Sequence, residues 1–484
     1  MSLDATAKAP DGERLARNSI GLLHIVFFVV AAAAPLTAVV GATPVAFAFG
    51  NGAGVPGAFV LAGLLYIIFS VGFTAMSRHV GGTGAFYTYI AQGLGRPAGI
   101  GGALIALLTY TSVQCAVYAL FGIFFAGSMA ALGLDLPWFV WSLLALVLVH
   151  FAGQRNISFS GKILGFAMVV EVLILLLLNI GIIWQGGGPE GMSLSSFSPS
   201  VVFTPGLAVA LVFVVGSFIG FESTAIFGEE ANDPDRTIPR ATFVAVLLIT
   251  TFYAFSTWAI VQFYGPSNIQ AAAAAEGGLE SLYFVAAEQV LGGWSVALMN
   301  VLLLLSLFAC VLSFHNTLNR YFFALGREGL LPHSLGRVDP KHGSPARAGV
   351  LQSLSAAALL IAFTLGGADP YAVVFSWMSG LAVLGVLAVQ IMVSLAIILY
   401  FRRAHAHDHS RMVTLVAPLL ALAGLVGAFL LVSLNTKLLT GSDHILVQAF
   451  PLLVILVGFC GPLLGIWIRS RNPELYNNLG RVFE

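Results

Sequence analysis

The chain has 484 residues, of which 58% are hydrophobic and only 9% are charged, and its formal net charge is zero. Soluble domains contain about 25% charged residues, so the composition excludes an ordinary water-soluble protein and offers no basic surplus for binding nucleic acid. Long apolar runs recur from residue 20 to residue 468. The sequence therefore predicts an all-α integral membrane protein that crosses the lipid bilayer many times.

The apolar runs are long enough for twelve transmembrane helices. They are unbroken stretches of Leu, Val, Ala, Phe and Gly without the alternation of a barrel strand, which excludes a β-barrel. In chain order the expected spans are 20–48, 57–77, 98–128, 137–153, 160–184, 206–228, 241–264, 293–323, 349–366, 371–400, 412–434 and 445–468.

Lysine and arginine are distributed unevenly between the two sides of these spans. With the N-terminus placed inside, every lysine and arginine except Lys437 falls on the inner side, in a loop, a tail or the inner end of a span. This predicts a plasma (inner) membrane protein with both termini in the cytoplasm. The expected parts are an N-terminal tail (1–19) without a cleaved signal, a ten-helix core (20–400), a cytoplasmic loop (401–411), two further helices (412–468) and a C-terminal tail (469–484).

The first and sixth spans are interrupted at their middles. Span one contains residues 34–44 (APLTAVVGATP), and span six contains residues 216–222 (GSFIGFE). A proline inside a helix removes a backbone donor and clashes with the preceding turn, so span one should kink or unwind at Pro35. Span six has glycines and a polar side chain at its middle, where residues that face hydrocarbon are expected. Broken helices five spans apart predict an inverted-repeat transporter that binds its substrate between them. Alternatively, Gly and Pro merely kink these helices.

Two carboxylates lie inside apolar spans, where an acidic side chain costs roughly 2–4 kcal/mol and usually faces a cavity or a partner. Glu222 is at the break in span six, and Glu171 is in the middle of span five. In such surroundings either could hold a proton at neutral pH and serve as a coupling site. The alternative is a protonated side chain that only bonds neighbouring helices. Ser112 in span three and Ser313 in span eight are weaker candidates, because serine also bonds back to its own helix.

Motifs for enzymatic chemistry are missing from the sequence. It contains no phosphate-binding Gly-Lys-Ser/Thr loop, no paired metal-binding cysteines and no nucleophile elbow, so no cofactor, metal site or catalytic residue is predicted. Residues 405–409 (HAHDH) have metal-ligand side chains, but a solvated cytoplasmic loop is the better interpretation.

Three segments resemble the amino acid–polyamine–organocation permeases. Residues 216–223 (GSFIGFES) with 229–241 (EEANDPDRTIPRA) are similar to that family's sixth helix and the turn that follows it. Residues 81–89 (GGTGAFYTY) to Gly95 and Arg96 resemble its loop between spans two and three, and residues 320–332 (RYFFALGREGLLP) resemble the end of its eighth span. The resemblance extends from span one to about residue 350.

This resemblance implies a five-plus-five inverted repeat with two added helices, working as a secondary transporter by alternating access. Its substrate contacts would fall on the following residues: Pro35, Leu36, Thr37, Ala38, Val39, Phe218, Ile219, Gly220 and Glu222. We add Ser112 of span three as a further candidate contact. Glu171 stands where proton-coupled relatives often carry a lysine, and we assign Glu171 and Ser313 to coupling. The chain lacks the Gly-Ser/Ala-Gly element with which relatives hold an α-amino acid carboxylate.

The sequence thus predicts a permease that moves an amino acid or related small amine with protons. A polyamine or monoamine carrier or exchanger is the alternative within the class. A channel or a membrane-embedded enzyme would be a different class. The sequence shows no pore-lining ring that would favour a channel and no cluster of catalytic residues that would favour an enzyme.

Overall fold

The structure, a computed structural model, describes residues 21–80, 85–154, 161–226, 231–339, 344–403, 410–436, 444–473, 476 and 479. These residues form helices and connecting turns, without a β-strand. Within them, nine helices are long and apolar enough to cross a membrane, judged by length and composition, and three shorter apolar helices accompany them. The predicted all-α, multi-pass membrane class is confirmed, whereas the count of twelve spans stays a prediction.

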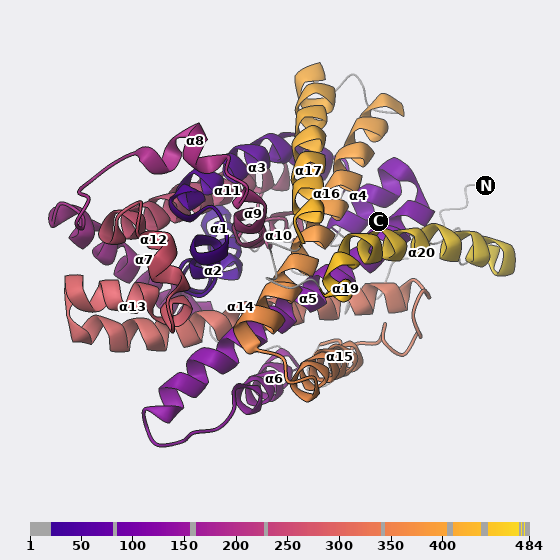
Figure 1. The fold of residues 1–484 in the computed structure, drawn as a ribbon. Coiled ribbons are helices and arrows are strands. Elements are labelled where there is room, and N and C mark those ends of the chain that lie inside the picture. Colours follow the sequence, from indigo (N-terminus) through magenta and orange to yellow (C-terminus); the bar gives the residue numbers. More distant parts are fainter. Residues whose placement is uncertain are drawn as a thin grey trace, which may run out of the picture.

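The spans correspond to a series of helices that Figure 1 labels in chain order. Span one is divided into α1 (Leu22–Ala33), η1 (Thr37–Ala42) and α2 (Thr43–Phe49), and span six into α9 (Leu207–Gly216) and α10 (Ser223–Ile226). The other spans are α3 (Val55–Ser77), α5 (Arg96–Ala130), α6 (Trp138–Gln154), α7 (Gly161–Trp184), α11 (Pro234–Tyr264), α14 (Gly293–Arg327), α15 (Ala346–Leu365), η5 (Pro370–Phe375) with α16 (Ser376–Arg403), η6 (Met412–Val416) with α17 (Ala417–Leu434), and α20 (Phe450–Arg471).

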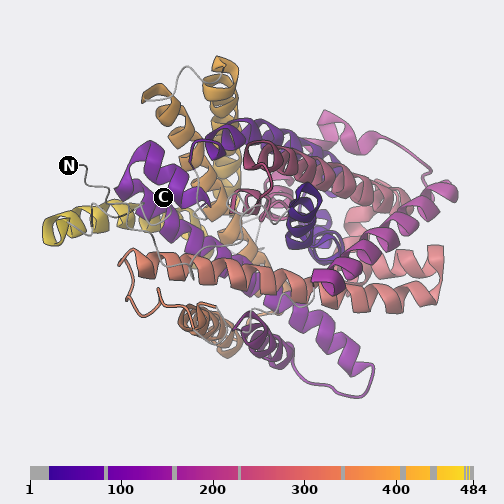
Figure 2. The ribbon, with the colours of Figure 1, turned by 180° about the vertical axis from the view of Figure 1, so that it is seen from behind.

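Short helices connect the spans. They are η2 (Gly52–Gly54), α4 (Ala85–Leu94), η3 (Ser195–Phe197), α8 (Pro199–Val202), α12 (Ile269–Ala274), α13 (Gly278–Leu291) and α19 (Ile445–Gln448). In both ribbon views α1 and α2 lie near the middle of the bundle, whereas α17 and α20 lie on its outside, away from α13 (Figures 1 and 2).

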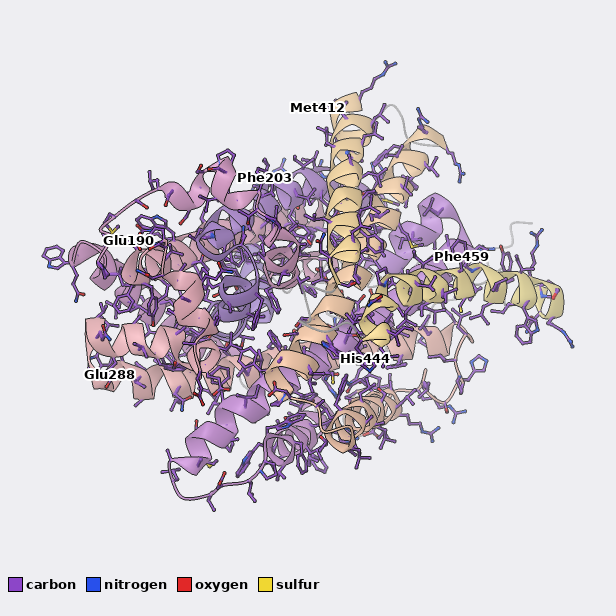
Figure 3. The ribbon with its side chains drawn as sticks, in the orientation of Figure 1. Glu190, Phe203, Glu288, Met412, His444 and Phe459 are labelled. Atoms are coloured by element: carbon purple, nitrogen blue, oxygen red, sulfur yellow. The ribbon has the colours of Figure 1, made fainter. Side chains whose placement is uncertain are left out.

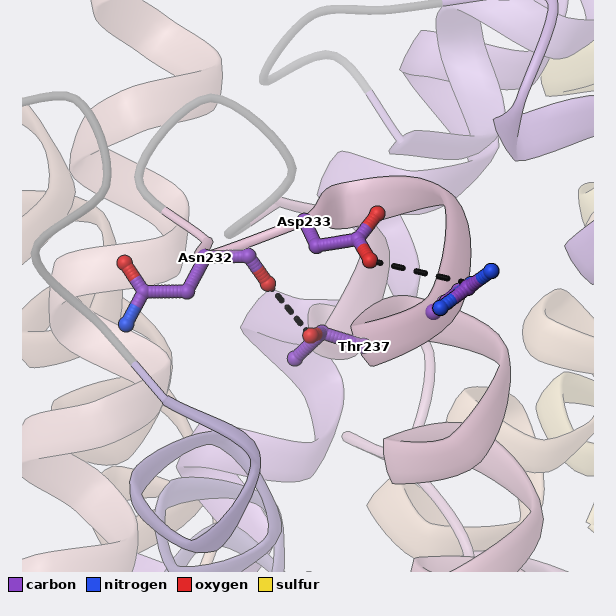
Figure 4. A network of polar contacts seen from close by, with 4 residues as sticks. Asn232, Asp233 and Thr237 are labelled. Atoms are coloured by element: carbon purple, nitrogen blue, oxygen red, sulfur yellow. Dashed lines mark hydrogen bonds and ion pairs between the residues drawn. The ribbon is translucent and has the colours of Figure 1, made fainter.

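The seventh span begins earlier than expected, at Pro234, because its first turn is stabilised locally (Figure 4). Asp233 takes a left-handed conformation (φ 50°) and its carboxylate lies 3.8 Å from the Arg236 guanidinium. The Thr237 hydroxyl donates a hydrogen bond to the Asn232 carbonyl. Proline suits the first position of a helix, where no partner for its missing N–H is needed. The family-like segment around residue 233 therefore builds a helix start.

Small residues allow the long helices to approach closely. A Cβ on Gly461 of α20 would lie 2.0 Å from the backbone nitrogen of Gly101 in α5, and one on Gly63 of α3 would lie 2.1 Å from the Thr250 hydroxyl of α11. Membrane helices lack a hydrophobic drive toward each other and associate through such close packing. Gly461 thus allows α20 to pack against α5, and Gly63 allows α3 to pack against α11.

Large apolar side chains point outward from α17 and α20. Phe459, labelled in Figure 3, is 63% exposed, and Leu463, Ile466 and Trp467 of the same helix are exposed as well. An exposed apolar surface of this extent is typical of a helix that faces lipid. These two helices therefore lie at the periphery of the bundle, with one face packed against it and the other turned outward.

Candidate functional site

The break in span one opens the backbone of the bundle's central helix. Helix α1 ends at Ala33, Ala34 has a left-handed conformation (φ 46°) that is uncommon for a residue other than glycine, and Pro35 follows. The Ala33 carbonyl, which the break leaves without its helical donor, accepts a hydrogen bond from the Tyr253 hydroxyl of α11 at 3.0 Å. A hydrogen bond from the neighbouring helix α11 thus stabilises the break in span one.

Glu171 of α7 reaches the other side of this break. It is 4% exposed, and its Oε2 lies 3.5 Å from the Leu36 backbone nitrogen, which donates to it. The Ser306 hydroxyl of α14 also bonds the Glu171 carboxyl and accepts a hydrogen bond from the Thr37 hydroxyl at 3.2 Å. Glu171 therefore links α7 and α14 to the interrupted backbone of span one.

The break in span six consists of turns between Gly216 and Ser223. Gly220 has φ 114°, which side chains disfavour, so glycine is required there. Glu222 is 1% exposed, and one of its carboxylate oxygens accepts the Gly220 N–H at 2.9 Å. The other accepts the Tyr110 hydroxyl of α5 at 2.5 Å. Glu222 therefore binds its own break to span three.

Aromatic rings surround Glu222 and fill the space next to it. Phe218 stacks on Tyr66 with ring centroids 4.8 Å apart, and Phe221 meets Tyr66 at 5.1 Å and Phe69 at 6.0 Å. The rings of Tyr110 and Tyr321 are 5.6 Å apart. Offset and edge-on ring pairs of this kind stabilise a packed layer.

A small cavity of about 60 Å³ lies between the two breaks. Pockets for small molecules usually have roughly 300–1,000 Å³, so this one must widen before it can hold a substrate. Its only polar side chains are the hydroxyls of Thr37, Ser217 and Ser379, and none of its lining residues is charged. The apolar and small lining residues are Ala33, Ala38, Ala42, Val113, Ala116, Val117, Leu120, Val212, Phe213, Gly216, Ile219, Cys310, Phe314, Phe375, Ala382 and Val383.

The structure separates the predicted contact residues into two groups. Thr37, Ala38 and Ile219 line the cavity. The others are buried around the breaks without lining it: Pro35, Leu36, Val39, Ser112, Phe218, Gly220 and Glu222.

Two predicted serines bond within their own helices. The Ser112 hydroxyl donates to the Leu108 carbonyl, and the Ser313 carbonyl accepts the Thr317 hydroxyl. Ser306, rather than Ser313, meets the break in span one, because seven residues correspond to about 10 Å along a helix. The transport roles of the residues that line the cavity, of those that do not, and of these two serines stay predictions.

Further hydrogen bonds connect the part of span one that follows its break to α13 and η5. The Tyr371 hydroxyl of η5 donates to the Gly41 carbonyl at 2.5 Å and approaches the Leu279 carbonyl of α13 at 3.3 Å. The hydroxyls of Thr43 and Tyr283 are 2.9 Å apart. Burial raises the pKa of Glu280, and the negative Asp369 raises that pKa further. These hydrogen bonds join η1 and α2 to α13 and η5.

Sequence reasoning missed Ser306 and Tyr253. Their signal was weak, since a serine or tyrosine in an apolar span has many possible roles, although a buried tyrosine hydroxyl usually finds a partner. Among the described residues, no group of three or more His, Cys, Asp and Glu side chains could hold a metal ion. Residues 405–409 lie outside the described residues, as do residues 81–84, Glu229, Glu230 and Lys437.

Comparisons with known proteins agree with this architecture. An uncharacterized transporter of Mycobacterium tuberculosis is 26% identical over 252 residues, which cover 50% of this chain and 54% of that protein. The low-affinity putrescine importer PlaP of Escherichia coli is 25% identical over 60% of this chain and 62% of its own length. The mouse large neutral amino acids transporter small subunit 2 is 29% identical over 43% of this chain and 36% of its own length.

These matches cover only part of each relative's length. The sequence model described as amino acid permease, however, matches residues 24–474 of this chain, which include both broken helices, the cavity between them and the two peripheral helices. The predicted resemblance is thereby confirmed, and the chain belongs to the amino acid permease family.

Proposed function

We propose that this protein is a secondary transporter that moves an amino acid or related small amine across the plasma membrane by alternating access. The observation that carries the proposal is the cavity between the broken spans one and six. Broken helices near the midplane supply free backbone groups to a substrate, and a carrier exposes such a site to each side of the membrane in turn. Membership of the amino acid permease family supports the same function.

Both termini lie in the cytoplasm under this proposal, because that orientation puts nearly all lysines and arginines on the inner side. A C-terminal fusion to green fluorescent protein should then be fluorescent in bacterial cells, whereas a fusion to alkaline phosphatase should be inactive. The reverse pattern would contradict the orientation.

Glu171 is the coupling residue in this proposal. It is buried, it has no ion-pair partner among the described residues, and it contacts the backbone of span one directly. A carboxyl group that gains or loses a proton there changes its bond to the Leu36 N–H, and so can link proton binding to the conformation of the break. Ser306 supports the carboxyl from α14.

The test is uptake into vesicles that contain the purified protein, with and without an imposed pH gradient. Wild type should accumulate substrate with the gradient. Glu171→Gln, which keeps the shape but cannot release a proton, should lose accumulation yet retain counterflow exchange. Glu190→Gln, which alters a loop carboxylate bonded to Asn268, is the matched control and should behave like wild type. Gradient-driven accumulation by Glu171→Gln would refute the coupling role.

Counterflow also distinguishes a carrier from the other classes. A carrier exchanges labelled for unlabelled substrate across the membrane and saturates, whereas a channel shows no such exchange. Chemical analysis of the vesicle contents would reveal an altered product if the protein were an enzyme. Saturable exchange of an unmodified substrate is expected.

A further inference from the structure

The central cavity contains no charge that could neutralise a doubly positive substrate. Every side chain on its wall is uncharged, and the only polar ones are the hydroxyls of Thr37, Ser217 and Ser379. The putrescine importer among the relatives is named for a diamine, whereas the mouse relative is named for large neutral amino acids. The relatives therefore suggest two substrate classes, diamines and neutral amino acids, and the side chains on the cavity wall can discriminate between them.

The two buried carboxylates nearest the breaks are occupied by groups of the protein itself. Glu222 accepts hydrogen bonds from Tyr110 and from the Gly220 N–H, and it is absent from the cavity wall. Glu171 accepts the Leu36 N–H and the Ser306 hydroxyl, and it does not line the cavity either. Neither oxygen pair is presented to a bound ligand.

The wall does offer acceptors for one ammonium group, which needs up to three. The hydroxyls of Thr37 and Ser217 donate their hydrogens to Ser306 and to the Phe213 carbonyl, so their lone pairs remain as acceptors. The backbone carbonyls of Ser217 and Ile219 accept no hydrogen bond from any residue that the structure describes. These groups come from both breaks, where helical bonding is interrupted.

The remainder of the wall is hydrocarbon. Val113, Val117 and Leu120 come from α5, and Phe213 and Phe375 come from α9 and η5. A second ammonium group would lie against these side chains without a counter-charge, which is strongly unfavourable in a membrane interior. An alkyl or aryl group would instead be buried favourably there.

We propose that the cavity selects substrates with a single ammonium group and an apolar side group, and that it rejects diamines and basic amino acids. This inference rests on the proposed transport function. Neutral apolar amino acids and apolar monoamines share the required chemistry, and the experiment separates them.

The experiment measures binding to the full-length protein in lipid nanodiscs by calorimetry, and uptake into vesicles. The probes are leucine and phenylalanine, the monoamine phenethylamine, the diamine putrescine, and lysine. At least one apolar probe should bind on the order of 100-fold more tightly than putrescine and lysine, the factor expected for an unpaired charge in the interior. If the amino acids bind and phenethylamine does not, the substrate carboxylate is also recognised.

A charge placed in the wall tests the cause of this selectivity. Val113→Asp should gain putrescine binding at least tenfold, whereas Val113→Asn, which matches it in shape, should not. Thermal unfolding of both variants establishes that they are folded. If they are not folded, the binding of the five probes to the wild-type protein decides whether the proposed selectivity holds.

The outcomes separate this inference from the transport proposal. Putrescine or lysine binding as tightly as the apolar probes overturns the selectivity but leaves the transporter intact. An equal response of the Asp and Asn variants contradicts the role of the missing charge. Absence of binding and uptake for every probe instead refutes the proposed transport function, and the selectivity with it.

Discussion

The hydrogen bond between Tyr110 and Glu222 provides a sharp test of how span six is held at its break. Tyr110→Phe removes only the hydroxyl that donates to the Glu222 carboxylate. Because Glu222 is 1% exposed, water cannot replace the lost donor, and the cost should be about 1–3 kcal/mol of unfolding free energy. For a protein of this size that corresponds to a fall of a few degrees in Tm.

Tyr321→Phe is the matched control. The Tyr321 ring lies 5.6 Å from that of Tyr110, but its hydroxyl is buried without a hydrogen-bond partner among the described residues. Removing that hydroxyl should leave Tm unchanged or raise it slightly, because an unsatisfied buried polar group is destabilising. The two variants thus differ in the predicted sign of the effect.

The assay is thermal unfolding in detergent, followed by intrinsic fluorescence. A third variant, Glu222→Leu, completes the comparison: in that background Tyr110→Phe should cost at least 1 kcal/mol less than in wild type, since paired residues are not additive. Equal shifts for Tyr110→Phe and Tyr321→Phe, or the same cost in both backgrounds, would refute the assignment of this bond.

Two further predictions concern packing and closure. Gly461→Ala should destabilise the contact between α5 and α20 and lower Tm, because its Cβ would lie 2.0 Å from the Gly101 nitrogen. Gly427→Ala, whose Cβ would meet nothing within 4 Å, is the control and should leave Tm unchanged. Equal Tm values for the two variants would contradict the close packing. Tyr371→Phe removes the hydroxyl bonded to the Gly41 carbonyl and should speed thiol labelling of Ala38→Cys in a cysteine-free background several-fold; unchanged labelling would show that this bond does not close the cavity.

The sequence alone was sufficient to locate the two breaks. Pro35 has no N–H to continue the helix of span one, and the glycines at 216 and 220 mark the turns of span six, where Gly220 takes φ 114°. These effects are local, since they depend on what one residue's backbone can do. The apolar length of the spans and the family resemblance were likewise readable without a structure, and both are confirmed.

The sequence did not determine which side chains face the cavity. Glu222 is predicted to contact substrate, and in the structure its carboxylate is bonded to Tyr110 and the Gly220 N–H. Ser306, which was not predicted, lies at the break in span one, and the coupling role of Ser313 stays a prediction. Spans five and six are apolar on nearly every side, so their periodicity does not identify an inward face. Each residue turns the helix by about 100°, and only the packing of neighbouring helices fixes that rotation. The tertiary structure therefore decided which of these polar groups bond to one another within the protein.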